Sequence, residues 1–75
     1  MMTDRSMSSH QQHELELLVD RCGLANVLTA LGNICAEKSD HVLTNWQDRN
    51  LANAWCKAMS VCDRAGSDPR VANLP

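Results

Sequence analysis

The chain has no phenylalanine and no tyrosine, and only two of its 75 residues are tryptophan. Any core that it forms must therefore be aliphatic, built from Leu, Val, Ile, Ala and Cys. A chain this short buries only about 60% of the surface that it exposes when unfolded, so it is marginally stable alone. We therefore expect one domain at most, supported by regular helix packing or by self-association.

Long apolar segments and a cysteine framework are also missing. No run approaches the roughly 20 apolar residues of a membrane span, and the polar start MMTDRSMSSHQQ lacks the apolar stretch of a signal peptide. Four cysteines fall short of the roughly 8–10% that marks a disulfide scaffold. The sequence therefore predicts a protein of the reducing cytoplasm with free thiols and no membrane partner.

Neither sign of charge dominates, and the common catalytic motifs do not occur. The formal net charge is −2, with acids and bases interspersed, so the basic stripe expected of a nucleic-acid binder is lacking. There is no glycine-rich phosphate loop, nucleophile elbow, H-E-x-x-H or C-x-x-C motif. We therefore expect a protein that is not an enzyme, has no cofactor or metal and does not bind nucleic acid.

What the chain does contain is helical periodicity, which begins near residue 9. Ser9 and Gln12 predict a capping box at the start of a first helix. Gly23 can adopt the left-handed conformation that ends it. The apolar residues between them follow helical spacing: Leu15, Leu18, Val19 and Cys22.

The second segment has the longest apolar stripe. It consists of Leu24, Val27, Leu28, Leu31, Ile34 and Cys35, and Lys38 and Val42 extend the same row. Gly32 lies inside this pattern at a cost of about 1 kcal/mol relative to Ala, so we expect another helix to approach closely there. The helix either runs unbroken to about Leu43 or kinks near Ser39 and Asp40.

A third helix is predicted to begin near Trp46. Thr44 with Gln47, or Asn45 with Asp48, could cap it, and Trp46 just inside it would fold back over the corner. Its apolar face is Leu51, Trp55, Ala58, Met59 and Cys62, with Ala54 alongside and Arg64 and Gly66 closing the helix. The segment SDPRVANLP has two prolines and no periodicity, which is typical of a tail.

These patterns predict an all-α fold, an antiparallel helical hairpin with a short leading helix. It would form a three-helix bundle or a dimeric four-helix-type bundle. The expected organisation is a flexible polar tail over residues 1–8, one helical domain over 9–66 and a flexible tail over 67–75.

Cysteine and histidine are the only chemical candidates. Three cysteines fall on apolar stripes and are expected to be small buried hydrophobic residues, whereas Cys56 is expected to be the most exposed thiol. His10 and His13 are spaced so that they could share a helix face and, with His41 or a cysteine, hold zinc. Cys35 and His41 could form a nucleophile–base pair only if a kink brought them together. Solvated histidines and structural thiols are the simpler interpretation.

The run RCGLANVLTALGNICAEKSDHVLTNWQDRNLANAW resembles that of short, uncharacterised bacterial helical proteins. The shared features are a glycine–leucine helix start, an Ile-Cys-x-Glu-Lys segment, a histidine and an Asn-Trp-Gln-Asp corner before a final helix. The resemblance spans roughly Leu15 to Ala65. It implies a small cytoplasmic helical protein, and it brings no activity and no site residues.

The sequence therefore predicts a small protein–protein interaction module, an adaptor, regulator or assembly factor that forms a homodimer and binds a further protein. Two alternatives stay open: a phage- or mobile-element-type inhibitor of a larger enzyme or complex, and a metal- or redox-responsive module. Trp46 is a possible partner-facing residue. The predicted core or interface residues are Leu18, Leu24, Leu28, Leu31, Ile34, Cys35, Leu51, Trp55, Met59 and Cys62.

Overall fold

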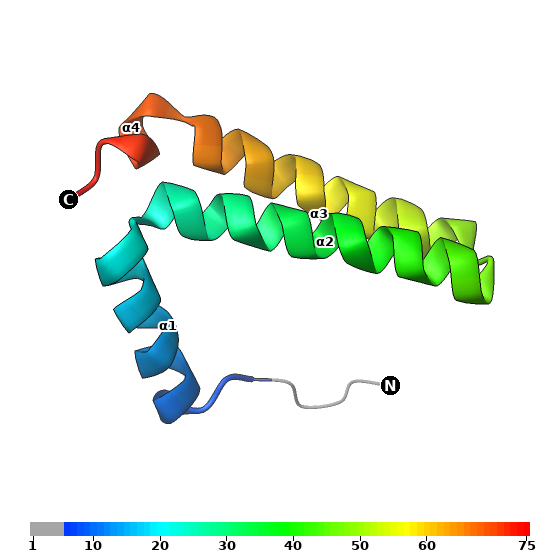
Figure 1. The fold of residues 1–75 in the computed structure, drawn as a ribbon, viewed down its shortest axis with the longest axis horizontal. Coiled ribbons are helices and arrows are strands. Elements are labelled where there is room, and N and C mark those ends of the chain that lie inside the picture. The colour runs from blue at the N-terminus through cyan, green and yellow to red at the C-terminus, as the bar shows by residue number, and fades with distance from the viewer. Residues whose placement is uncertain (1–5) are drawn as a thin grey trace.

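The computed structural model describes residues 6–75, and it is helical throughout most of that range. The elements are α1 (Ser9–Cys22), α2 (Leu24–Trp46), α3 (Arg49–Ser67) and α4 (Pro69–Ala72). Helices α2 and α3 lie side by side and antiparallel, α1 projects away from them, and α4 folds back toward the start of α2 (Figure 1). The predicted all-α hairpin with a short leading helix is confirmed.

A capping box does start α1, but one residue earlier than predicted. The Ser8 Oγ accepts a hydrogen bond from the Gln11 backbone N–H at 3.1 Å, and the Gln11 Oε1 accepts one from the Ser8 N–H at 2.9 Å. The sequence Ser-Ser-His-Gln-Gln satisfies the capping pattern in two adjacent registers, Ser8–Gln11 and Ser9–Gln12. The pattern alone could not choose between them.

Gly23 separates α1 from α2 with a backbone that favours glycine. Its φ of 86° and ψ of 147° lie in a region that side-chain-bearing residues rarely adopt. The positive φ is as predicted, although the ψ value is extended rather than left-handed helical. The Gly23 N–H donates to the Val19 carbonyl, and the Gly23 carbonyl accepts from the Val27 N–H. One residue thus closes α1 and opens α2 in a new direction.

Helix α2 runs unbroken through Ser39 and Asp40 to Trp46, which decides against the kink. The third helix therefore does not begin near Trp46. Gln47 takes a left-handed φ of 53° and Asp48 caps α3, its carboxylate accepting from the Leu51 N–H at 3.0 Å. The predicted Thr44 and Asn45 caps are wrong, since both residues lie inside α2.

Small residues let α2 and α3 approach closely. A Cβ on Gly32 would lie 2.5 Å from the Asp63 carboxylate oxygen and 3.5 Å from the Cys62 Cβ, which confirms the expected close approach. Gly66 has the same role from the other side, because a Cβ there would lie 3.2 Å from the Ala25 carbonyl oxygen. The prediction that Gly66 closes the helix is wrong, since α3 continues to Ser67.

The predicted tails are partly structured. Residues 1–5 of the N-terminal tail lie outside the described residues, and Ser8 belongs to the cap of α1. In the C-terminal segment, Asp68 caps the short helix α4 and Pro69 occupies its first position, where a missing N–H costs nothing. The flexibility of both tails stays a prediction.

The core between the helices is thin. Within residues 6–75, the only hydrophobic side chains that are buried are Val42 and Ala52, and Ser39 is the only buried polar one. The Cα radius of gyration is 14.3 Å, whereas a compact domain of this length has about 11 Å. A single chain therefore leaves much of its apolar surface uncovered.

Candidate interaction surface

One flank of each hairpin helix contacts the other helix, and the neighbouring flank is apolar and uncovered. On α2 the contacting flank includes Gly32 and Ser39. At about 100° per residue, Leu31 and Ile34 lie roughly a quarter turn or more away from that flank. Leu31 is 39% exposed and Ile34 is 47% exposed. Two of the six apolar residues of the longest stripe are thus left exposed to solvent.

Helix α3 repeats this arrangement. Ala52 and Gly66 face α2, while Ala58 and Val61 lie on the adjoining flank, rotated in the same sense about the helix axis. Val61 is 56% exposed. Because the two helices run antiparallel, equal rotations bring both uncovered flanks to the same side of the hairpin. We call this side the open apolar face: Val27, Leu31, Ile34, Leu51, Ala54, Ala58 and Val61.

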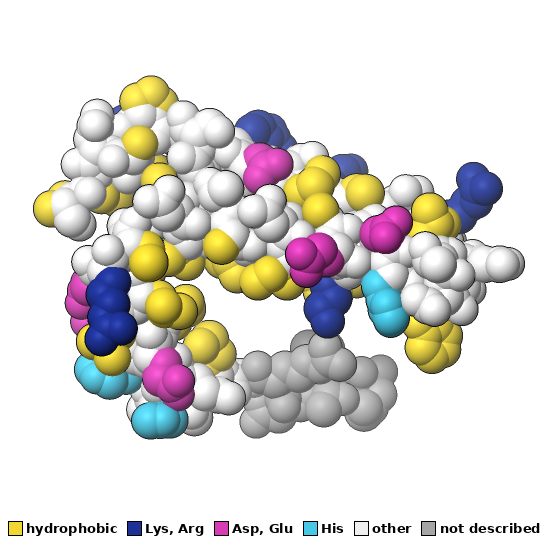
Figure 2. Space-filling model, in the orientation of Figure 1, with side chains coloured by type: hydrophobic (Ala, Val, Ile, Leu, Met, Phe, Trp, Pro, Cys, Tyr) yellow, Lys and Arg dark blue, Asp and Glu magenta, His cyan; other side chains and the backbone are white. Residues whose placement is uncertain are grey.

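The opposite side of the hairpin is polar. The polar residues on the other flank of each helix lie on average about 130° from the open flank. All of them are exposed: Asn26, Asn33, Asp40, Asn53, Ser60 and Ser67. The hairpin is therefore amphipathic as a unit. Hydrophobic side chains also gather along the edge of α2 that faces the hollow beside α1, and on α1 itself (Figure 2). This contrast between two sides is typical of a protein that buries one face against a partner.

The leading helix adds apolar residues that its own chain does not cover. Leu15 and Val19 are half-buried, whereas Leu18 and Cys22 are exposed. Burial of Cys22, expected from its position on the stripe, is therefore not found in the single chain. The reason is tertiary: α1 meets α2 only near their junction and then diverges from it (Figure 1).

The residues predicted to form a core or interface divide into two groups. Six of them are half-buried between the helices: Leu24, Leu28, Cys35, Trp55, Met59 and Cys62. The other four are exposed: Leu18, Leu31, Ile34 and Leu51. Leu31, Ile34 and Leu51 lie on the same side of the hairpin but at different heights, whereas Leu18 lies on α1. The signal that sequence reasoning missed is Val61, which directly precedes Cys62 and falls on the outer edge of the predicted stripe.

The Cys35 thiol lies where its environment favours the neutral form. Burial raises the pKa of the Cys35 thiol, and the Cys62 thiol beside it raises that pKa further. A thiol with a raised pKa is a weaker nucleophile at neutral pH, because the thiolate is the reactive form. Cys56 is exposed, as is Cys22, so the prediction that Cys56 is the most exposed thiol stays a prediction, and the Cys56 Sγ lies 3.1 Å from the Ser39 Oγ.

The histidines make local contacts. His10 Nε2 lies 3.0 Å from Glu14 Oε1 on the same helix, and His41 Nδ1 lies 3.0 Å from Asn45 Nδ2. On the straight helix α2, the six positions between Cys35 and His41 rotate the two side chains apart by about 240°. The structure does not bring them together. Across residues 6–75, no three His, Cys, Asp or Glu side chains gather closely enough to hold a metal ion.

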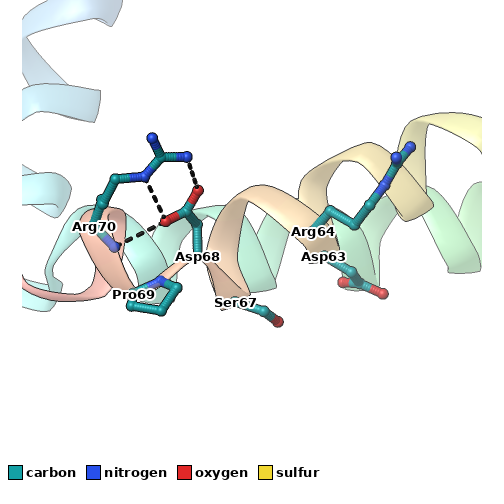
Figure 3. Close-up of a pocket in the computed structure, with 6 residues that line it drawn as sticks. All are labelled: Asp63, Arg64, Ser67, Asp68, Pro69 and Arg70. Carbon is teal, nitrogen blue, oxygen red and sulfur yellow. Dashed lines mark hydrogen bonds and ion pairs between the residues drawn. The ribbon is translucent and has the colours of Figure 1, made fainter.

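A shallow depression lies where α3 turns into α4 (Figure 3). It is lined by Asp63, Arg64, Ser67, Asp68, Pro69 and Arg70. Asp68 Oδ1 accepts from the Arg70 backbone N–H at 2.8 Å and Oδ2 pairs with the Arg70 guanidinium at 2.9 Å. These bonds lower the pKa of the Asp68 carboxyl. Asp63 and Arg64 point away from this pair (Figure 3), so the side chains stabilise the turn without converging on a common point.

Trp46 occupies the tip of the hairpin as the last residue of α2, and it is 73% exposed. The expectation that it folds back over the corner is wrong, because the helix end carries its ring outward. Its role toward a partner stays a prediction. Leu43, one turn earlier, is also exposed.

The chain matches no protein-family model, and neither the curated proteins nor the solved structures contain a significantly similar one. No helix in the described part of the chain combines the length and apolar content needed to cross a bilayer.

Proposed function

We propose that this chain is a small non-enzymatic protein–protein interaction module, an adaptor, regulator or assembly factor that works through its open apolar face. The main observation behind the proposal is that the hairpin has one apolar side and one polar side. Leu31, Ile34 and Val61 are exposed on one side, and the other side is lined by asparagine and serine. Contiguous apolar surface of this kind marks sites that a partner covers.

The thin core supports the same proposal. Only Val42 and Ala52 are buried hydrophobic residues among those described, and the larger apolar side chains between α2 and α3 are only half-buried, so the hairpin leaves much apolar surface in water. Burial stabilises by roughly 25 cal/mol per Å² of apolar surface. Covering the open face would therefore stabilise the fold and the complex together, which favours a surface used for binding.

The proposed compartment is the cytoplasm. All four cysteines are free thiols, and a reducing compartment preserves that state. The bacterial source implied by the resemblance stays a prediction.

Photo-crosslinking in cells that express the chain natively tests the proposal. Ile34 on the open apolar face is replaced by p-benzoylphenylalanine, and the matched control carries the same group at Asn33, its exposed neighbour on the polar side. We expect covalent protein adducts from position 34 and few from position 33. Equal yields at the two positions, or no protein adduct at all, would refute an interaction surface on this face.

A further inference from the structure

We propose that the occupant of the open apolar face is a second copy of this chain, paired face to face about a two-fold axis parallel to α2 and α3. This inference rests on the proposed function for the use of that face, and it goes further by naming the partner and the geometry. The product is a four-helix bundle made of two hairpins.

The exposed area is the first argument. The chain exposes 6308 Å², whereas a compact folded monomer of 8.3 kDa exposes about 4,600 Å². Counting residues 1–5 at the full area of unfolded chain accounts for at most about 900 Å² of the difference. The remaining excess of about 800 Å² equals what each partner contributes to an interface of standard size. This excess, to which the diverging helix α1 also contributes (Figure 1), is large enough for one side of a dimer interface.

Shape complementarity within the face is the second argument. The α2 flank presents larger side chains, Val27, Leu31 and Ile34, whereas the α3 flank has the small residues Ala54 and Ala58 at its centre. A row of large side chains packs best against a row of small ones on the facing helix. The face is therefore complementary to itself only when α2 of one copy lies over α3 of the other.

The symmetry axis follows from that requirement. Rotation about an axis parallel to the helices exchanges the two flanks and keeps each residue at its own height along the bundle. The hairpin register is set by Gly32 beside Cys62 and by Ser39 beside Ala52. At that register, Ile34 lies opposite Ala58 and Val61 of the second copy. An in-plane axis perpendicular to the helices would instead stack α2 on α2, with large side chains against large ones.

The charges of the face are compatible with this pairing. The open flank of α2 carries no carboxylate, and Lys38 is the charged residue that continues its row. The aliphatic stem of a lysine can cover apolar surface while its ammonium group reaches water. At the same register, Lys57 of the second copy lies at the height of Lys38, at the outer edge of the α3 flank. Both ammonium groups can therefore reach water at the rim of the interface, and the polar side of each hairpin stays in solvent.

Sedimentation equilibrium of the purified full chain tests the stoichiometry. We expect a particle of twice 8.3 kDa for the wild type and for the control Asn33→Glu, and loss of the dimer for Ile34→Glu. Because Ile34→Glu could also unfold the chain, the wild-type melting temperature is measured over a hundredfold range of concentration. A dimer melts at higher temperature as concentration rises. A helical monomer whose melting temperature is independent of concentration overturns the proposal.

Mixed-isotope crosslinking tests the geometry. Chains labelled with ¹⁵N and unlabelled chains, both carrying p-benzoylphenylalanine at position 34, are mixed, irradiated and digested. Adducts between labelled and unlabelled peptides that map to residues 58–61 support the parallel axis, whereas adducts that map to α2 overturn it. A monomer in solution combined with cellular adducts to a different protein overturns the dimer but leaves the proposed function standing. Absence of any cellular protein adduct overturns both.

Discussion

Ser39 and Cys56 face each other across the hairpin, with the hydroxyl oxygen 3.1 Å from the sulfur. The same hydroxyl donates to the Ala52 carbonyl oxygen at 2.8 Å, and Ser39 is buried. A buried hydroxyl without a partner is costly, so these contacts favour the one register in which α3 supplies both groups. A residue that looks like a kink site in the sequence thus fixes how α2 and α3 align.

Replacing Ser39 should show this contribution. We expect Ser39→Ala to lower the free energy of unfolding by about 1 kcal/mol, the usual net worth of one hydrogen bond. For a chain of this size, that corresponds to a drop of about 4–8 °C in melting temperature. Thermal melts followed by circular dichroism measure it, with the exposed Ser60→Ala as control. An unchanged midpoint for Ser39→Ala would show that the hydroxyl does not stabilise the register.

The two glycines inside the hairpin should respond differently to alanine. At Gly32 the nearest atom to a new Cβ is the end of the Asp63 side chain, which can move aside. The Gly32→Ala variant should therefore retain much of the roughly 1 kcal/mol of folding stability that alanine has over glycine inside a helix. At Gly66 the obstacle includes the Ala25 backbone carbonyl at 3.2 Å, which is fixed within α2. We expect Gly66→Ala to be less stable than Gly32→Ala in urea unfolding. The reverse order would contradict the packing.

Thiol reactivity should separate the cysteines. Because burial and the neighbouring Cys62 raise the pKa of Cys35, less of it is thiolate at neutral pH, and access to it is reduced. We expect Cys35 to react with iodoacetamide several-fold more slowly than the exposed Cys22 and to accelerate at higher pH than an ordinary thiol. Peptide mass spectrometry of time points measures both rates. The rates in urea, where both thiols are exposed, serve as the reference. Equal rates for Cys35 and Cys22 in the folded chain would contradict the reduced reactivity of Cys35.

The turn between α3 and α4 should loosen in acid. Hydrogen bonds from Arg70 lower the pKa of Asp68, so the folded turn binds that proton less readily than the unfolded chain does. Its stabilisation is present above the ordinary carboxyl pKa and is lost as pH falls through the lowered value. The protection factors of the Val71 and Ala72 amides, which correct the exchange rate for its intrinsic pH dependence, should therefore fall on acidification. Asp68→Asn should lack this dependence while Asp63→Asn retains it. If amide protection at Val71 and Ala72 depended on pH in the same way in the wild type and in Asp68→Asn, protonation of Asp68 would not be the cause.

Local chemistry determined much of this structure from the sequence alone. Helical periodicity and the absence of strand-like alternation predict the helices, because the spacing of apolar residues reflects the helix repeat. Gly23 was recognisable as a boundary, since its positive φ favours glycine. Gly32 was recognisable as a point of close approach, since a residue without a side chain inside an apolar stripe leaves room for another helix. The cap of α1 was recognisable as a pattern, but its register was not, because Ser8 and Ser9 satisfy it equally.

Only the tertiary structure decided what each apolar stripe contacts. The residues of α2 form one continuous row in the sequence, yet α3 covers Leu28, Cys35 and Val42 while Leu31 and Ile34 stay exposed. A helical wheel shows how wide an apolar stripe is, but it does not show which part of the stripe the neighbouring helix contacts. That depends on the close approach at Gly32 and Gly66 and on the hydrogen bonds of Ser39. The corner was equally undetermined, because Thr44, Asn45 and Asp48 are all competent caps. Asn45 bonds back to the His41 carbonyl within α2, and Asp48 alone is left to start α3.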